Sequence, residues 1–380
     1  MSRIDELIVE LCPNGVEYVS IGSLISKVTE KRKNNTSINQ VFVVSSTLGL
    51  VKAEEYRENT IHSEDTSNYT IVMPNSFAYN PARLNIGSIA LNNTAISGLV
   101  SPMYVVFSVN EDKILPKYME LILKTRFIIG KINAFKEEGA RFRFDFSRWN
   151  WINIPLPPIV IQKEIINILS VFTEYNNLLT AELTARKKQY EYYRDLLLDF
   201  GVHSGAISEC EWRTIKEIAY RVASGKNKEK NQEGAYPVYG STGIIAYCNH
   251  YEYKKKQILI ARVGANAGYV HIADGKYDVS DNTLIVDVND CVLFKYIYYL
   301  LVNMNLNRFA KGGGQPLVTA GQIKEISIPI PPIEEQERIV SILDRFDKLC
   351  NDISEGLPAE IEARRKQYEY YRDKLLSFNS

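Results

Sequence analysis

Residues 186–200 read RKKQYEYYRDLLLDF, and residues 364–378 read RRKQYEYYRDKLLSF, so twelve of fifteen positions are identical at an offset of 178 residues. A second pair of stretches lies upstream. Residues 154–169 read IPLPPIVIQKEIINIL and residues 328–343 read IPIPPIEEQERIVSIL, with nine of sixteen positions identical at an offset of 174. A period this long exceeds that of any solenoid repeat, so the chain is a tandem duplication of a whole domain followed by a helix.

Both copies carry the apolar spacing of a long helix, with steps of four and three residues. The seam of the first copy is Ile161, Ile165, Ile168, Phe172, Tyr175, Leu179, Leu183, Arg186, Tyr190, Tyr193, Leu197 and Phe200. The seam of the second copy is Ile339, Ile342, Phe346, Leu349, Ile353, Ile361, Arg364, Tyr368, Tyr371, Leu375 and Phe378. Helices of about forty residues are roughly 60 Å long and would overhang a small domain. We therefore expect the two to pair as an antiparallel coiled coil; the alternative is that each packs on its own domain.

The two copies differ by four extra residues in the second helix, near Ser354–Pro358. Four residues make about one helical turn, which roughly preserves the buried face as a stutter. Gly356 and Pro358 are expected to break or kink the helix there, because proline is tolerated best at a helix start. The pseudo-two-fold symmetry of the repeat should therefore be imperfect.

Two globular parts of mixed helix and strand remain, which predicts an α+β protein. We divide the chain into a first domain with a short N-terminal helix (1–157), a first helix (158–205), a second domain (206–331) and a second helix (332–380). Expected strands of the first domain are Val41–Ser45, Tyr69–Met73, Ile86–Leu91 and Tyr104–Val109, followed by a helix at Pro116–Phe135. Expected strands of the second are Tyr236–Tyr239, Gln257–Arg262, Tyr269–Ile272 and Thr283–Val288, followed by a helix at Leu293–Phe309. The order is the same although most residues differ, which predicts two related surfaces for two different targets.

Composition sets broad limits. Lys and Arg number 45, as do Asp and Glu, so the net charge is zero and argues mildly against a nucleic-acid binder. Local clusters can still be basic. Five scattered cysteines in a chain of 380 residues favour a reducing cytoplasm over a disulfide framework. We expect neither a signal peptide nor a membrane span.

Familiar catalytic motifs are missing from the sequence. The glycine run 312–314 lacks the Lys-Ser/Thr of a phosphate-binding loop, and no HExxH, Cys/His metal spacing or GxSxG occurs. Asn80-Pro81-Ala82-Arg83 faintly resembles the NPP-aromatic tetrapeptide of adenine methyltransferases but lacks the second proline and the aromatic residue. We therefore predict that this chain holds no catalytic residues, metal or cofactor.

Basic residues cluster with amides and aromatics in loops at matching places in the two domains. The candidate DNA-binding residues are Lys31, Arg32, Lys33, Arg83, Asn85, Arg141 and Arg143 in the first domain, and Lys226, Lys228, Lys230, Arg262, Asn266, Lys311 and Gln315 in the second. Arg, Asn and Gln read base edges bidentately, whereas Lys suits phosphates. A single charged run is as often a solvated face, and an Arg-Phe alternation is also typical of a strand with one buried face. The correspondence between copies favours the DNA hypothesis.

The two repeated blocks together resemble the specificity subunit of type I restriction–modification systems, over nearly the whole chain. The resemblance implies two target recognition domains, each reading one half of a split DNA site through the major groove, with the paired helices fixing the gap. It also implies two modification subunits that use S-adenosylmethionine, and restriction subunits that use ATP with Mg²⁺. Catalysis would belong to those partners. Residues expected to form the coiled coil or partner-docking surface are Tyr190, Tyr193, Leu197, Tyr368, Tyr371 and Leu375.

Two other classes of function are compatible with parts of the sequence. A coiled-coil scaffold without a DNA role would suit the zero net charge. A single-chain methyltransferase or nuclease would need motifs that are missing.

Overall fold

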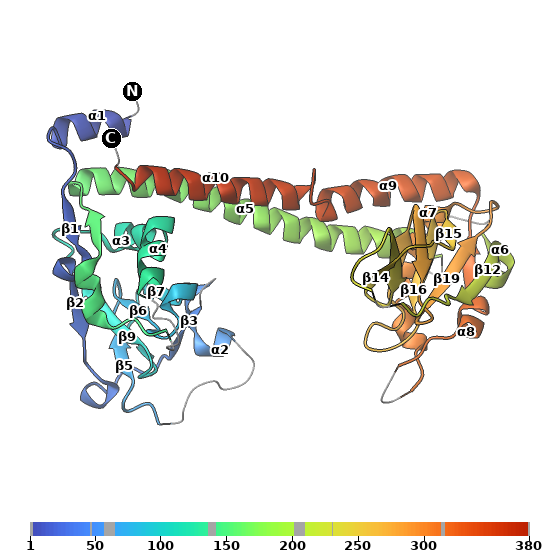
Figure 1. Cartoon of the computed structure of the whole chain (residues 1–380), viewed down its shortest axis with the longest axis horizontal. Coiled ribbons are helices and arrows are strands. Elements are labelled where there is room, and N and C mark those ends of the chain that lie inside the picture. Colours follow the sequence, from blue (N-terminus) through green and yellow to red (C-terminus); the bar gives the residue numbers. More distant parts are fainter. Residues whose placement is uncertain are drawn as a thin grey trace. The chain divides into compact units, whose positions relative to one another are not determined.

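The computed structural model describes residues 3–45, 48–56, 65–135, 142–200, 210–229, 231–312 and 316–378. The chain forms two compact units: the first comprises Met1–Leu179 and Ile361–Ser380, and the second comprises Thr180–Glu360. Helix α5 (Ile159–Leu198) is continuous for 40 residues and contributes to both units (Figure 1). Each unit therefore combines one globular domain with helical segments from both copies of the repeat. Among the described helices, none is both long and apolar enough to cross a membrane.

The first unit is built on a four-stranded antiparallel sheet of order β2-β9-β6-β7. Its strands are β2 (Ile25–Val28), β9 (Val105–Val109), β6 (Phe77–Tyr79) and β7 (Ile89–Leu91). The central strands are short apolar runs with little exposed surface, as expected for a sheet covered on both faces. Phe77 and Phe107 stack across neighbouring strands with ring centroids 4.9 Å apart. The register pairs Val28 with Val106 and Tyr79 with Val105, so the loops after β2 and β6 leave from one end of the sheet.

Smaller elements surround this sheet. The paired strands are β1 (Tyr18–Ser20) with β10 (Asn153–Pro155), β3 (Phe42–Ser45) with β4 (Gly49–Lys52), and β5 (Thr70–Val72) with β8 (Gly98–Val100). The helices are α1 (Arg3–Leu11), α2 (Ala53–Tyr56), α3 (Pro116–Leu123) and α4 (Arg126–Ala134), with 3₁₀ turns η1 (Ile21–Leu24), η2 (Arg32–Asn34), η3 (Leu84–Ile86) and η4 (Phe146–Trp151). The single helix expected at Pro116–Phe135 is wrong. Thr125 caps α4 by accepting a hydrogen bond from the Ile128 amide, and this starts a new helix.

The second unit repeats the same frame, with a sheet of order β12-β19-β16-β17. Its strands are β12 (Ala219–Ser224), β19 (Thr283–Val288), β16 (Gln257–Ala261) and β17 (Val270–Ala273). A second sheet of order β14-β13-β18-β15 contains β14 (Gly243–Cys248), β13 (Tyr236–Gly240), β18 (Lys276–Val279) and β15 (Tyr253–Lys254). Strand β11 (Glu211–Thr214) pairs with β20 (Ser327–Ile330), as β1 pairs with β10. The remaining elements are α6 (Ile215–Ile218), α7 (Phe294–Asn303), η5 (Leu306–Phe309) and α8 (Ala320–Lys324).

The expected antiparallel pairing of the helices is confirmed inside each unit. In the first unit, the start of α5 lies beside α10 (Leu357–Leu375), with Phe172 packed on Tyr371 and the Arg364 guanidinium over the Tyr175 ring, each at 5.6 Å. In the second unit, the end of α5 lies beside α9 (Ile333–Asn351). There Tyr190 and Tyr193 pack on Phe346 at 6.1 and 5.8 Å between centroids.

The second helix of the repeat is two helices of 19 residues, with a break at residues 352–356. The Asp352 carboxylate accepts hydrogen bonds from the Ser354 amide and hydroxyl and from the Glu355 amide, which closes a turn in place of the next helical turn. A Cβ on Gly356 would lie 2.5 Å from the Lys348 carbonyl oxygen, so only glycine fits there. The extra residues thus form a break, as Gly356 and Pro358 predicted.

The buried glutamine of each IPxPPxxxQ block joins the domain to its helix. Gln162 is fully buried; its side-chain oxygen accepts from the Leu115 amide, and its nitrogen donates to the carbonyls of Lys113 and Pro157. Gln336 does the same in the second unit, with the Leu293 amide and the Pro331 carbonyl. Leu115 and Leu293 are the N-cap residues of α3 and α7, so the repeated glutamine fixes the start of each domain helix.

The end of each RKxQYEYYRDxLL block completes the core of a globular domain. Leu376 is buried in the first unit's core, where Tyr368, Leu375 and Phe378 also pack. Leu198 is buried in the second unit's core, where Tyr190, Leu197 and Phe200 also pack. The block that follows the first domain in sequence therefore belongs to the core of the second, and the last block belongs to the core of the first. This excludes packing of each block on the domain that precedes it.

Candidate nucleic-acid interface

The candidate site of the second unit is the end of its sheet at which β12 and β16 finish and β19 begins. The register pairs Ser224 with Leu284 and Ala261 with Thr283, so three loops leave from this end. We call it the second loop end: residues 225–229 (the lysine loop), 262–269 (the arginine loop) and 280–282. The corresponding first loop end comprises residues 29–35, 80–88 (the arginine loop of the first unit) and 101–104, placed by the same strand order.

Close backbone contacts hold the second loop end together. The Lys226 amide donates to the Val279 carbonyl at 3.1 Å, and the Gly225 amide donates to the Thr283 carbonyl at 3.0 Å. A Cβ on Gly225 would lie 2.2 Å from the Val279 oxygen, so this approach requires glycine. The Arg262 amide donates to the Asn282 carbonyl at 2.9 Å. These contacts gather the lysine loop and the arginine loop around residues 279–283.

A fourth segment, which follows α7 in the sequence, also contacts the arginine loop. The Val318 amide donates to the Arg262 carbonyl at 2.8 Å, and the Gly264 amide donates to the Pro316 carbonyl at 3.0 Å. Lys311 exchanges two backbone hydrogen bonds with Leu317. The structure thereby brings Lys311 to the neighbourhood of Arg262, although the two are about fifty residues apart in sequence.

The arginine loop of the first unit is held in a comparable way. The Arg83 amide donates to the Asn80 carbonyl at 3.0 Å, and Gly87 ends the turn at φ 84°. The Phe144 amide donates to the Pro81 carbonyl at 2.9 Å, which places the segment of Arg143 beside this loop. Burial raises the pKa of the Tyr104 hydroxyl, while the nearby positive charge of Arg83 opposes that shift.

The predicted basic side chains differ in how available they are to contact a ligand. Arg32 is committed to its own loop, because its guanidinium donates to the Ile38 carbonyl, the Thr66 hydroxyl and the Asn39 side chain. Lys31 donates to the Thr70 hydroxyl at 2.8 Å. These two side chains brace the loop, which the sequence alone did not reveal.

Other predicted side chains stand in solvent. The exposed ones are Lys33, Arg83, Arg143, Lys226, Lys228, Asn266 and Lys311, and Asn85 and Arg262 are partly exposed. Arg143 lies 3.4 Å from the Asp145 carboxylate in an exposed ion pair. The Arg262 guanidinium donates to the Asp281 carbonyl at 3.4 Å. The predictions for Arg141, Lys230 and Gln315 lie outside the described residues.

The structure adds residues to the second loop end that sequence reasoning missed. These are Tyr269, Asn305 and Asn307, which line a cavity of about 270 Å³ beside the arginine loop together with the predicted Asn266. Tyr269 is 57% exposed. Amides and an aromatic ring are groups that contact bases. The signal in the sequence was the spacing of three asparagines at 303, 305 and 307.

The residues predicted for the coiled coil or docking surface are mostly internal. Tyr190, Leu197, Tyr368 and Leu375 are partly buried against the cores, while Tyr193 and Tyr371 stack on the facing helix. The most exposed tyrosines of the repeat are Tyr192 and Tyr370, at 63% and 61%, against 38% and 37% for Tyr193 and Tyr371. Each lies 5.4 Å from the following tyrosine at an interplanar angle of 74°, so the two copies present the same surface.

The chain matches the family described as type I restriction modification DNA specificity domain at residues 13–186 and 208–363. It is 34% identical over 312 residues to the Escherichia coli type I restriction enzyme EcoR124I/EcoR124II specificity subunit, covering 73% of this chain and 74% of that protein. It is 34% identical over 216 residues to the Escherichia coli EcoprrI specificity subunit, covering 53% of this chain and 52% of that protein.

Solved structures share the fold. A chain from a structure of the type I R-M system, solved to show its complex assembly and conformational transition, has a TM-score of 0.68 at 17% identity, covering 96% of this chain and 98% of that one. The type I restriction-modification S subunit from M. genitalium has a TM-score of 0.55 at 16% identity, covering 97% and 98%. The repeated frame and the matches over both of its copies agree, and they favour DNA specificity over a scaffold without a DNA role. The chain belongs to the family of type I restriction–modification specificity subunits.

Proposed function

We propose that this specificity subunit reads a split DNA site, with the first loop end on one half-site and the second loop end on the other. The observation that carries the proposal is that both sheets have the same strand order and direct basic loops from the same end, while the side chains in those loops differ. Two sheets of the same strand order would present their loops to DNA in the same geometry. Because the side chains in those loops differ, each domain can read a different half-site sequence. Exposed Lys33, Lys226 and Lys228 suit phosphates, and Arg83 and Arg262 suit base edges.

The helices would set the unread gap between the half-sites. Two rigid modules on one face of B-DNA need a separation of about one helical turn, roughly 34 Å. A 40-residue helix such as α5 is long enough to serve as that spacer. A change in its length would change the gap and leave both half-sites as they are.

Catalysis would belong to partner proteins of the restriction–modification complex. We propose that two modification subunits, which bind S-adenosylmethionine and methylate adenine, dock on the helical repeat. Restriction subunits that use ATP and Mg²⁺ would join them. The five free cysteines suit work in a reducing cytoplasm, where the DNA also lies.

The experiment compares Arg83→Ala and Arg262→Ala in complex with the modification partner, with the methylated sites mapped across a genome. We expect Arg83→Ala to relax the sequence of the first half-site only, and Arg262→Ala the second only. A lost bidentate contact removes about 1–3 kcal/mol of discrimination against the wrong base. Lys216→Ala is the control, because this exposed residue lies on α6 at the opposite end of the second sheet.

A uniform loss of affinity for all sequences in both variants would show that these arginines hold phosphates. Methylation that depends on neither domain, or no DNA binding by the partnered wild type, would overturn the proposed function.

A further inference from the structure

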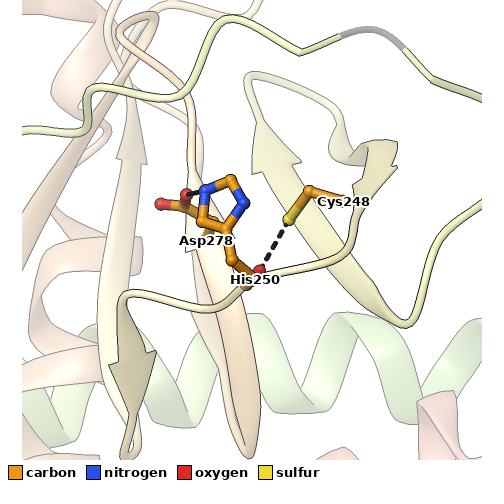
Figure 2. A group of neighbouring side chains, drawn as sticks. All are labelled: Cys248, His250 and Asp278. Atoms are coloured by element: carbon orange, nitrogen blue, oxygen red, sulfur yellow. Dashed lines mark hydrogen bonds and ion pairs between the residues drawn. The ribbon is translucent and has the colours of Figure 1, made fainter.

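Three side chains with different metal-binding chemistry meet in the second unit. The thiol of Cys248, the imidazole of His250 and the carboxylate of Asp278 lie with their ligand atoms within 4.8 Å of one another. Figure 2 shows the His250 ring beside the Asp278 carboxylate, with the Cys248 sulfur facing the same loop. None of the three lies at the loop residues assigned above to DNA.

The second sheet of this unit brings the three together. Cys248 is the last residue of β14, and Asp278 lies in β18. Both strands pair with β13, which aligns Tyr236 with Cys248 and Val238 with Asp278. His250 follows Cys248 by two residues in the loop. Cys248 and Asp278 are 1% and 7% exposed, so both are fixed by strands in the interior of the domain.

Asp278 is a buried carboxylate with little positive charge around it. Its Oδ2 accepts from the Asn227 side chain at 2.8 Å, and its Oδ1 accepts from the Val279 amide at 2.7 Å. Within the described part of the chain, the one basic side chain in ion-pair range is His250, whose Nε2 lies 3.3 Å from Oδ2. Buried charges in proteins are normally paired or coordinate a metal, so a cation at this point would offset the cost of burial.

A second carboxylate lies beside the ring nitrogen of His250 that would not bind the metal, as is common for histidine ligands in other proteins. Glu229 Oε1 lies 3.6 Å from His250 Nδ1, the ring nitrogen away from Asp278. A histidine that binds metal through one nitrogen almost always donates its other N–H to a carboxylate, carbonyl or water. The Asn227 amide likewise orients the Asp278 carboxylate.

We propose that Cys248 Sγ, His250 Nε2 and an Asp278 carboxylate oxygen bind a zinc ion, with water in the fourth position. Thiolate, imidazole and carboxylate in one small cluster match the ligand preferences of Zn²⁺. The Cys248 thiol now donates to the His250 carbonyl at 2.9 Å. On binding, this thiol releases its proton to solvent and the sulfur bonds to the metal. The largely exposed His250 side chain gives the ion a path from solution.

The site would also stiffen the second loop end. Asn227 and Glu229, which contact two of the three ligands, lie in the loop that carries Lys226 and Lys228. Zinc binding would therefore strengthen binding to the second half-site, a consequence that rests on the proposed function. The metal site itself does not rest on it.

Co²⁺ titration of the purified full chain, stripped of metal by a chelator, tests the site directly. We expect one Co²⁺ to bind per chain, with visible ligand-field bands and a near-ultraviolet band from thiolate-to-cobalt charge transfer. Added Zn²⁺ should displace the Co²⁺, so that both kinds of band disappear. Cys248→Ser should lose the charge-transfer band. His250→Gln, a change in a largely exposed side chain that the fold tolerates, should weaken binding by at least about tenfold.

Cys291→Ser is the matched control, because Cys291 is an exposed free thiol of the same unit outside the cluster. It should retain both bands. A titration without a thiolate band, or with bands unchanged in Cys248→Ser and His250→Gln, would overturn the metal site and leave the proposed function standing. Binding of Co²⁺ by a protein that then binds no DNA with its partner would overturn the proposed function and leave the metal site standing.

Discussion

Gln162 and Gln336 are single residues on which the start of a domain helix depends. In Gln162→Met, a change of similar volume, the buried Leu115 amide and the carbonyls of Lys113 and Pro157 lose their partner. An unpaired buried polar group costs about 1–3 kcal/mol. We expect the first unit to lose more than about 2 kcal/mol in its free energy of unfolding.

Hydrogen exchange measured by mass spectrometry locates the effect. Exchange should accelerate at the start of α3 in Gln162→Met and at the start of α7 in Gln336→Met, each without the other. Lys163→Met, at the neighbouring exposed position, should leave both unchanged. Equal acceleration of both helices in either variant would contradict a local role.

We expect His271 to make the stability of the second unit sensitive to acid. Its ring stacks on Tyr239 and Tyr269, and neither ring nitrogen has a hydrogen-bond partner among the residues that the structure describes. Burial lowers the pKa of His271 from 6.5 to about 4, so the neutral form is favoured in the folded chain. Its contribution to stability is complete above pH 6.5 and is lost as the pH falls from there towards about 4.

The measurement is urea unfolding of the wild type and His271→Phe at several pH values across this range. The loss of stability on acidification should be smaller in the variant, because phenylalanine keeps the stacking and takes up no proton. Identical pH dependence in the two proteins would show that His271 is protonated as easily in the folded chain as in the unfolded one.

The sequence predicted the matching positions of the candidate loops better than it predicted how their individual side chains are held. The Lys31 cluster matches the Lys226 cluster, and Arg83 matches Arg262, because the two domains share one strand order. The internal repeat in the sequence indicates that shared order. The hydrogen bonds that occupy Arg32 depend on Thr66 and Asn39, and these are set by loop geometry. The Cys248 cluster was missed because Asp278 is far away in sequence; the spacing of Cys248 and His250 was its only local signal.

At the scale of elements, Gly356 determines how the second helix breaks. A Cβ there would meet backbone oxygens of Lys348, Asp352 and Leu349 at 2.5–2.9 Å, and backbone cannot move aside without distorting α9. We expect Gly356→Ala to destabilise the second unit by about 1–3 kcal/mol, as overpacking does. Thermal unfolding followed by circular dichroism measures it.

Gly130→Ala is the control within another helix. Gly130 lies in α4, and a Cβ there has open space. Alanine should be neutral or stabilise by up to about 1 kcal/mol, because it has the higher helix propensity. A Gly356→Ala protein as stable as Gly130→Ala would show that the break adapts to a side chain.

The long helices were predictable because their seam repeats, whereas several other elements were not. Strands β10 and β20 contain Pro155 and Pro329, and proline in a sequence is typical of the boundary of an element. Each of these strands lies at the edge of a two-stranded ribbon, where a proline is tolerated. The break between α3 and α4 depends on the cap at Thr125, a signal hidden inside an apolar run.

At the scale of the whole molecule, two equal surfaces should bind two equal partners. Tyr192 and Tyr370 are exposed, occupy identical positions in the repeat and have the same ring geometry. We expect Tyr192→Ala and Tyr370→Ala each to leave one modification subunit bound, and the double variant to leave none. Mass measurement of the assembled complex by light scattering gives the count.

Tyr175→Ala is the control, since this exposed tyrosine of α5 corresponds to Leu349 in the second copy and so is not a repeated surface tyrosine. It should keep two partners. Retention of both partners by the double variant would place docking elsewhere on the chain.

The exchange of helix ends between the two units bears on how the chain folds as it is made. A ribosome releases the first domain early, yet Tyr368, Leu375 and Leu376, which belong to the first domain's core, are synthesised only after the whole second domain. Leu198, the buried residue of the first repeat that packs in the second domain's core, is synthesised before the strands of that domain. The first domain, although it is synthesised first, should therefore be the last to complete its core. Until then, the apolar surface that the second helix later covers would be exposed to chaperones.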